Sequence, residues 1–483
     1  MRETLTSKFT ILALLGATTL SGCAGFGANL SNPLDRFRPE PTVIETATPA
    51  PPEPKWAAYV PDALPSTDWV ADFNDPMLSR IIDRALYANT DVRGARARLD
   101  AAEQNVIISA QGLRPSVTAT GRASHSEFGN EFIGDSNSFN GGIGASWEAD
   151  VWGRVRDTAN AGELEYDASG ADYAAARLSI AGSSAQAWFD LIEARLQTEL
   201  AERNLETQNR ALRLTERRFR SGLTTSADVR IARSSVASAE ASLALRQQQQ
   251  SAFSRRIEIL LRQYPQAQLE ASRDLPELPP LPGLPGPEEL LVRRPDLIAA
   301  ERRMAAQGLR VDIARKALLP RLTLSADGNF QAGDISEFFD IDALVGTILA
   351  NLVAPIYQAG ALKAEVKRNE AVLRQQVESY AGTVLGAYLD VENALDAEQR
   401  LAEREAALRV ALEEAQQAET RLERQYSQGL VNILLLLDAQ TRAINAESAL
   451  ISARKERLAN RVRLHLALGG GTYGAPVALA AVP

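Results

Sequence analysis

The chain has 483 residues and a formal net charge of −9, and Ala, Leu, Glu, Arg and Gln dominate its composition. These residues favour long helices, so we expect a mainly helical scaffold. The negative charge argues against a nucleic-acid partner, because nucleic-acid-binding proteins carry an excess of Lys and Arg. With one Cys and two His, the sequence predicts no metal site and no catalytic residues, and we expect no enzyme activity.

Residues 1–22 have the features of a secretory signal peptide. Arg2 and Lys8 precede the apolar run FTILALLGATTL, which is too short for a membrane-spanning helix. The run ends in LSGC, which resembles the bacterial lipoprotein box. That resemblance implies that Cys23 carries covalent lipid, the only non-protein group we expect, and that Ala24 directs sorting to the outer membrane. A buried structural Cys is the alternative.

Residues 23–76 are expected to form a lipidated, extended tether. Ten prolines lie between Gly25 and Pro76, and this composition cannot propagate a helix. A second proline cluster, LPELPPLPGLPGPEE, covers residues 275–289. We interpret it as a linker between two halves of the chain.

The two halves, residues 77–274 and 290–471, resemble each other in sequence. At an offset of 205 residues the segment beginning at Asn89 aligns without gaps with the segment beginning at Arg294. At an offset of 207 residues RSGL aligns with SQGL, which places Gly222 on Gly429. This period is far longer than that of solenoid repeats, so we infer a duplicated half-protein followed by a tail at residues 472–483.

Each half predicts the same order: a helix ending at Pro115 or Pro320, two strands, a very long helix, a turn and a returning helix. Proline is absent from residues 116–264 and 356–475, so nothing forbids long helices. Arg154 to Phe219 is 66 residues. As one continuous helix this segment would be roughly 100 Å long.

The second long helix changes its apolar spacing along its length. Its upper part predicts a nearly straight helix, because the apolar residues recur about every 3.67 positions. Beyond Leu401 the spacing becomes heptad-like, interrupted by Glu405 and Glu419, which predicts a supercoiled lower end. The upper apolar positions are Leu373, Val377, Tyr380, Val384, Tyr388, Val391 and Leu395.

Four segments alternate between apolar and polar residues, as strands with one apolar face do. They begin at Ser116, within SFNGGIGASWEAD, at PRLTLSADGNF and at about Ala343, and the last, ending near Leu352, alternates poorly. The apolar positions of the first three are Val117, Ala119, Gly121 and Ala123, then Phe139, Ile143, Ala145 and Trp147, then Leu322, Leu324, Ala326, Gly328 and Phe330. A half-buried soluble sheet would alternate in the same way.

The length of these segments fits tilted membrane strands of about 9 to 11 residues. Four strands cannot close a barrel, and an open edge in lipid is costly, so the barrel must be shared between copies. Two copies would give a barrel whose interior is filled by side chains, whereas three copies leave room for a passage. We therefore expect a trimer.

Several segments in order carry a family resemblance that covers nearly all of the chain from about Asp68. They are DWVADFNDPMLSRIIDRALYANTDV, the proline linker leading into LLVRRPDLIAAERR, the paired RSGL and SQGL turns, and LHLALGGG. The chain resembles the TolC-like outer-membrane factors of tripartite RND-type efflux systems, specifically their lipoprotein branch. The implied fold is mainly α with a small membrane β-barrel, built from duplicated halves with four strands per protomer and twelve strands per trimer.

The resemblance also implies function and partners. A homotrimer would lie in the outer membrane of a Gram-negative bacterium, lipid-anchored and surrounded by outer-membrane lipid, and its helical tunnel would project into the periplasm. It would be a passive conduit that exports small molecules such as drugs and toxic compounds. Its partners would be a periplasmic membrane-fusion adaptor and an inner-membrane RND-type pump, with no nucleic acid.

Site residues follow from the same resemblance. It places the adaptor-docking tip at Gly222, Leu223, Gly429 and Leu430, although these glycines could merely end helices. It places a periplasmic gate at Asp228, Tyr426 and Asp438. The chain departs from the best-known gate at Val431 and Leu435, where that pattern has an Arg and a pore-facing Asp.

Two other functions compete with this prediction. A lipid-anchored coiled-coil scaffold spanning the periplasm would explain the helices but not four strands placed symmetrically in two halves. The other alternative is the outer-membrane conduit of a type I protein secretion system.

Overall fold

The computed structural model describes residue 56 and residues 68–127, 136–332, 334 and 344–475. All of them belong to one compact unit, Thr48–Pro483. Cys23, the signal peptide at residues 1–22, most of the tether and most of the tail lie outside the described residues. No described helix is both long enough and apolar enough to cross a membrane.

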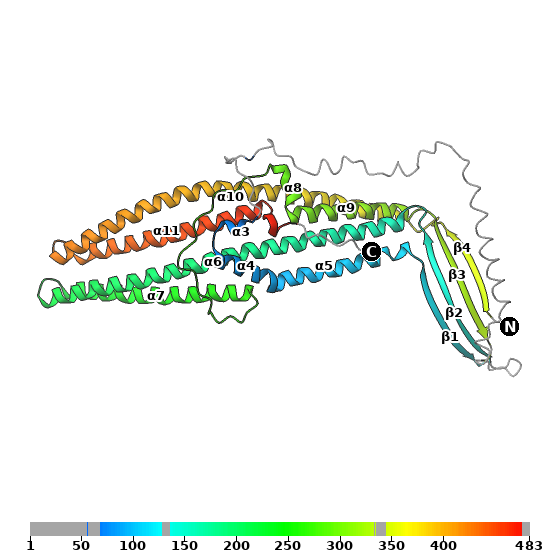
Figure 1. Cartoon of the computed structure of the whole chain (residues 1–483), viewed down its shortest axis with the longest axis horizontal. Helices are drawn as coiled ribbons and strands as arrows, with labels where there is room; N and C mark the ends of the chain where they lie inside the picture. The colour runs from blue at the N-terminus through cyan, green and yellow to red at the C-terminus, as the bar shows by residue number, and fades with distance from the viewer. Residues whose placement is uncertain (1–55, 57–67, 128–135, 333, 335–343, 476–483) are drawn as a thin grey trace. The chain divides into compact units, whose positions relative to one another are not determined.

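The two halves repeat the same order of elements, as predicted (Figure 1). The first half contains α3 (Trp69–Asp72), α4 (Pro76–Ala88), α5 (Thr90–Ser109), η2 (Ala110–Leu113), β1 (Ser116–Ser126), β2 (Ser136–Ala149), α6 (Arg154–Arg220) and α7 (Ser226–Leu260). The second contains η3 (Pro287–Glu289), α8 (Leu290–Arg293), α9 (Pro295–Lys316), β3 (Arg321–Ala332), β4 (Leu344–Val353), α10 (Ala361–Gln428), α11 (Ile433–Ala467) and η6 (Gly471–Tyr473). Both α5 and α9 end a few residues before the predicted prolines, because a residue preceding proline disfavours helical backbone.

The long helices α6 and α10 are continuous over 67 and 68 residues. Each begins after a glycine with positive φ, Gly153 at 75° and Gly360 at 84°. Asp150 lies just before Gly153 and accepts hydrogen bonds from the amides of Val155 and Arg156 in the first turn of α6, both at 2.9 Å. Each long helix then turns back into a 35-residue helix, so that α6 pairs with α7 and α10 with α11 (Figure 1).

The four strands form one antiparallel sheet in the order β1-β2-β3-β4. Opposite residues in an antiparallel pair point to the same face. The register places Ala119 opposite Ile143, Trp147 opposite Leu324, and Ala326 opposite Ile348, so the predicted apolar positions of the first three strands share one face with Ile348 of the fourth. Ile348 is 85% exposed on that face.

The other face of the sheet is mainly polar. Its pairs include Thr118 opposite Gly144, which in turn faces Asp327. The fourth strand is one residue displaced from its predicted start, and Leu349 on its polar side faces Ser325, which explains its poor alternation. Among the described residues, β1 and β4 are the edge strands of the sheet.

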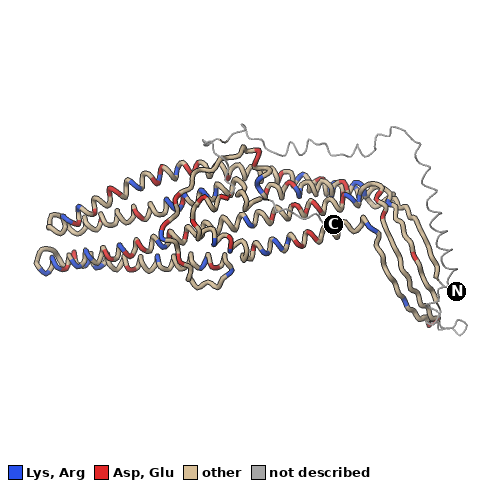
Figure 2. The backbone as a smooth tube through the Cα atoms, in the orientation of Figure 1, with Lys and Arg blue, Asp and Glu red and all other residues tan. Residues whose placement is uncertain are grey.

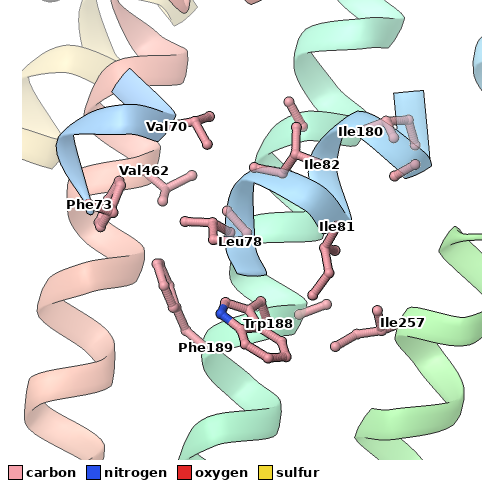
Figure 3. Packing of buried hydrophobic residues seen from close by; sticks show 14 of the residues in the cluster. Val70, Phe73, Leu78, Ile81, Ile82, Ile180, Trp188, Phe189, Ile257 and Val462 are labelled. Carbon is pink, nitrogen blue, oxygen red and sulfur yellow. The ribbon is translucent and has the colours of Figure 1, made fainter. Parts of the chain in front are cut away.

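The predicted tether differs from the structure over its last residues. Trp69 to Asp72 form α3, capped by Asp68, and Trp69 and Phe73 are buried. These aromatic residues pack on α6 and α11, and Figure 3 shows Phe73 beside Phe189 and Val462. The free energy gained by burying these large apolar side chains stabilises a short helix in a segment whose proline content predicts an extended chain.

The proline segment at residues 275–289 is packed on the cores of both halves. Leu275 and Leu278 contact the core around Trp188, and Leu281 and Leu284 contact the core around Val384. Arg461 of α11 is buried and donates a hydrogen bond to the carbonyl of Pro279. The segment is therefore part of the folded unit and not a free linker.

The predicted apolar stripe of α10 is confirmed, because its residues form or line the second core. Tyr380, Val384, Val391 and Leu395 are buried there, and Leu373, Val377 and Tyr388 pack against them. Lower on α10, Glu405 interrupts the heptads yet is buried. It accepts hydrogen bonds from Arg409 and Arg457, each at 2.7 Å, so opposite charge compensates its burial.

Candidate functional site

The two hairpin turns have the same backbone geometry. Gly222 has φ of +70° and Gly429 has φ of +83°, a region that favours glycine. In each turn the next leucine amide bonds to a carbonyl five residues earlier: Leu223 to Arg218 and Leu430 to Gln425, both at 2.9 Å. This is a Schellman motif, which satisfies the last carbonyls of the long helix.

The turns expose apolar side chains. Leu223 is 67% and Leu430 is 69% exposed. A Cβ placed on Gly222 would meet nothing within 4 Å, whereas one on Gly429 would lie 3.3 Å from Nη2 of Arg218. The glycines therefore do terminate helices, and the first turn also has open space for another surface to approach.

The predicted gate residue Asp228 caps the helix that follows the first turn. Its carboxylate accepts hydrogen bonds from the Thr225 amide at 2.9 Å and from the Thr224 and Thr225 hydroxyls. The Asp228 amide bonds back to the Thr225 hydroxyl at 3.2 Å, which completes a capping box. The hydrogen bonds from Thr224 and then Thr225 hold the pKa of Asp228 below its usual value.

Tyr426 is joined to α6. It is 2% exposed, and its hydroxyl lies 2.8 Å from the hydroxyl of Thr215. Arg218 donates from Nη1 to the Tyr426 carbonyl at 2.5 Å, and its guanidinium carbon lies 4.9 Å from the centre of the Tyr426 ring. We call Thr215, Arg218 and Tyr426 the tip latch, because they connect the first hairpin to the second.

The structure does not bring the three predicted gate residues together within one chain. Asp228 is engaged in its own helix cap, and Asp438 is exposed and pairs with Arg442 at 2.8 Å. Thr215 and Arg218 were missed by sequence reasoning, although Arg218 lies directly before the RSGL turn.

A shallow depression lies beside the second turn. It is lined by Leu430, Val431, Asn432, Leu434, Leu435 and Asp438. Leu434 and Leu435 are both exposed. Val431 and Leu435, the two departures from the known gate pattern, thus lie in one depression with Asp438, and Leu434 is a further exposed residue that sequence reasoning missed.

Metal-ligating side chains do not gather in the described part of the chain. No group of three or more His, Cys, Asp or Glu residues there could hold a metal ion. His465 is buried and its ring stacks on Trp69 at 5.8 Å. Burial, and then the charge of Arg461, lowers the pKa of His465 to about 3, so this histidine is neutral at physiological pH.

Comparison with known proteins identifies the family. The family described as outer membrane efflux protein matches residues 81–261 and 286–470, one segment in each half. The pyoverdine export outer membrane protein OpmQ of Pseudomonas aeruginosa is 32% identical over 473 residues, which cover 95% of this chain and 98% of that protein. The probable efflux pump outer membrane protein TtgC of Pseudomonas putida is 29% identical and covers 87% of this chain and 89% of that protein.

Solved structures agree with this match. The outer-membrane channel OprN aligns with a TM-score of 0.80 and 28% identity over 88% of this chain and 99% of that chain. The outer membrane protein VceC from Vibrio cholerae aligns with a TM-score of 0.77 and 26% identity over 84% of this chain and all of that chain. The chain therefore belongs to the outer membrane efflux protein family, whose members are the outer-membrane channels of efflux pumps.

Proposed function

We propose that three copies of this chain form a passive conduit through the outer membrane, in which β4 of each copy pairs with β1 of the next. The observation that carries the proposal is the open four-stranded sheet with one exposed apolar face and two free edges among the described residues. In lipid each unpaired backbone group costs several kcal/mol, and pairing between copies removes that cost. The apolar face then meets lipid and the polar face lines the passage.

The helices of the three copies form a tunnel that projects into the periplasm. The hairpin turns at Gly222, Leu223, Gly429 and Leu430 are the tip, where a periplasmic membrane-fusion adaptor docks. The adaptor connects the channel to an inner-membrane pump of the RND type, which supplies the energy. Lipid on Cys23 anchors the chain to the outer membrane.

The cargo consists of small molecules that the pump selects. Relatives of this chain are named for the export of pyoverdine, toluene, antibiotics and cations, which differ widely in size and charge. A conduit that serves such different pumps does not itself need a specific binding pocket. We therefore assign this chain a role in passage and assembly.

The tip latch holds the lower ends of the two hairpins together in the resting channel. Its contacts join α6 to the last turn of α10, so separation of the hairpins must break them. Asp438 and the exposed leucines beside it are then the residues closest to the opening. This assignment retains Tyr426 and Asp438 as gate residues and gives Asp228 the role of stabilising the turn.

Cross-linking tests the trimer directly. Within one chain β2 and β3 separate β1 from β4, a distance of roughly 14 Å at 4.8 Å per strand. A disulfide needs Cα atoms within about 7 Å, so a bond between Cys at Ala119 of β1 and Cys at a position on β4 can form only between copies. We expect Ala119→Cys combined in turn with Gly346→Cys, Ile348→Cys or Ala350→Cys to give a covalent trimer in at least one case.

The matched control places the first Cys at Ile143, which faces the same side of the sheet as Ala119. Ile143 lies on β2, which is not an edge strand. It should give no trimer with the same β4 partners. Step-like conductance of the purified protein in a planar bilayer provides the functional measurement. Absence of both the cross-link and the conductance would refute the conduit and favour a scaffold.

A further inference from the structure

The tip of the first hairpin carries a strong positive charge that the second tip lacks. Residues 210–233 contain seven Arg against Glu216 and Asp228, a net charge of +5. The equivalent residues 417–440 contain two Arg against two Glu and one Asp, a net charge of −1. This contrast arises between two turns of the same backbone geometry, in a chain that is acidic as a whole. Figure 2 shows the blue segments along α6 and α7 near their turn.

Three arginines of α6 near the first tip share one face of the helix. Arg213, Arg217 and Arg220 are four and three residues apart on α6, a spacing that places side chains on the same side of a helix. Glu216 lies between them and pairs with Arg233 of α7 at 2.8 Å. Arg230 is one turn from Arg233 on α7, so it flanks the same ion pair.

Four of these side chains form no ion pair among the described residues, because the neighbouring Glu216 pairs with Arg233. Arg213, Arg217, Arg220 and Arg230 are exposed and form no ion pair with a described carboxylate. Higher on the same helix, by contrast, Arg154 and Arg203 pair with Glu148 and Glu447. Exposed arginines that lie close together without ion pairs repel one another. A carboxylate of a partner would therefore be attracted to them without breaking an existing ion pair.

An exposed apolar residue accompanies the charge. Phe219 is 45% exposed, although its equivalent in the second half, Tyr426, is buried. Together with Leu223 it gives the tip an apolar surface beside the turn, on a different side of α6 from the arginine row. Arginine and aromatic residues next to one another are typical of protein interfaces.

We propose that the arginine face of the first tip, formed by Arg213, Arg217, Arg220 and Arg230, binds an acidic segment of the periplasmic adaptor, and that the second tip docks on the adaptor without this charge recognition. The inference rests on the proposed function, since it assumes that an adaptor docks at the tip. The inference adds to the proposed function that the docking segment of the adaptor is negatively charged and that the first hairpin binds it. The face selects among adaptors, because a basic segment would meet like charge at every arginine.

The test begins by finding a working adaptor. A panel of purified adaptors is co-expressed with the wild-type channel and a pump in a strain without its own efflux components, and the adaptor that restores drug export becomes the probe. If none restores export, the proposed function itself fails. If one does, its binding to the detergent-purified trimer is measured for the wild type and for two variants.

The first variant replaces Arg213, Arg217 and Arg220 by Gln and should bind the adaptor about tenfold more weakly. The second replaces the same three residues by Lys, which keeps the charge, and should bind within about twofold of the wild type. Raising the salt from about 0.1 M to about 1 M shortens the Debye length from about 10 Å to about 3 Å, and should weaken binding of the wild type more than binding of the Gln variant, which keeps Arg230. Unchanged binding of the Gln variant overturns the proposal.

Two further measurements complete the test. Substituting Glu for the three arginines should abolish binding, and changing acidic residues at the adaptor tip to Lys should restore it. Isolated cell-wall sacculi, another periplasmic source of carboxylates, are tested in parallel for sedimentation of the trimer. If the Gln variant loses sacculus binding and keeps adaptor binding, the arginine face serves the cell wall and the proposal is wrong.

Discussion

The tip latch makes a quantitative prediction through the hydrogen bond between Tyr426 and Thr215. Thr215→Val keeps the volume of the side chain but leaves the buried Tyr426 hydroxyl without that partner, which costs about 1–3 kcal/mol. Tyr426→Phe costs less, about 1 kcal/mol, because the Thr215 hydroxyl keeps its bond to the Ala211 carbonyl at 2.8 Å. The double variant should cost less than the sum of the two single variants.

Hydrogen exchange by mass spectrometry measures the local free energy of opening at the ends of α6 and α10, and single-channel conductance reports the gate. We expect both single variants to exchange faster at the tip, to leave exchange around Trp188 unchanged, and to raise the open fraction. A coupling of about 0.5–1.5 kcal/mol in the double-mutant cycle would establish the contact. Strict additivity, or wild-type exchange in Thr215→Val, would show that the two hairpins are not held together in this way.

Three other predictions concern the anchor, the tip and the shaft. Cys23→Ser should abolish acylation, and mass spectrometry that finds an unmodified Cys23 in the mature wild-type protein would contradict the lipid anchor. Gly429→Trp should sharply reduce drug export and adaptor cross-linking, while trimer formation and membrane insertion persist. The reason is that the substitution adds volume at the turn and about 1 kcal/mol of local strain at positive φ. Failure of the trimer to assemble would instead make the glycine a purely structural residue. Burial alone would raise the pKa of Glu405, but Arg457, Arg409 and Arg454 hold this pKa below its usual value. The stabilising contribution of Glu405 is therefore present above the ordinary pKa of Glu and is lost as the pH falls through the lowered pKa. Thermal unfolding in detergent should therefore show a smaller loss of stability between neutral and acidic pH for Glu405→Gln than for the wild type.

Much of the fold could be predicted because its signals are local or repeated. The alternating residues of β1, β2 and β3 gave both the strands and the face they share, since the side-chain period of a strand is two. The turns at Gly222 and Gly429 were predicted from an internal alignment, because only glycine readily takes the positive φ that both turns need. The long helices followed from the absence of proline.

The contacts between distant segments could not be predicted in the same way. Arg218 and Tyr426 lie 208 residues apart, and no local pattern indicates that one hydrogen-bonds to the other. The short helix α3 was missed because the proline content of the whole segment predicted an extended chain. The segment nevertheless contains one capped helical turn, in which Trp69 stacks on His465. Side-chain packing decided both cases, and packing depends on three-dimensional neighbours.

The packed proline segment has a consequence for how the protein unfolds. Duplicated halves joined by a loose connection would melt as two separate transitions, each with its own midpoint. Here one continuous stretch supplies Leu275 and Leu278 to one core and Leu281 and Leu284 to the other, so when one core opens, the segment that covers the other loses its attachment at one end. We therefore expect the two repeats to unfold together as one cooperative unit, and not as two independently stable modules.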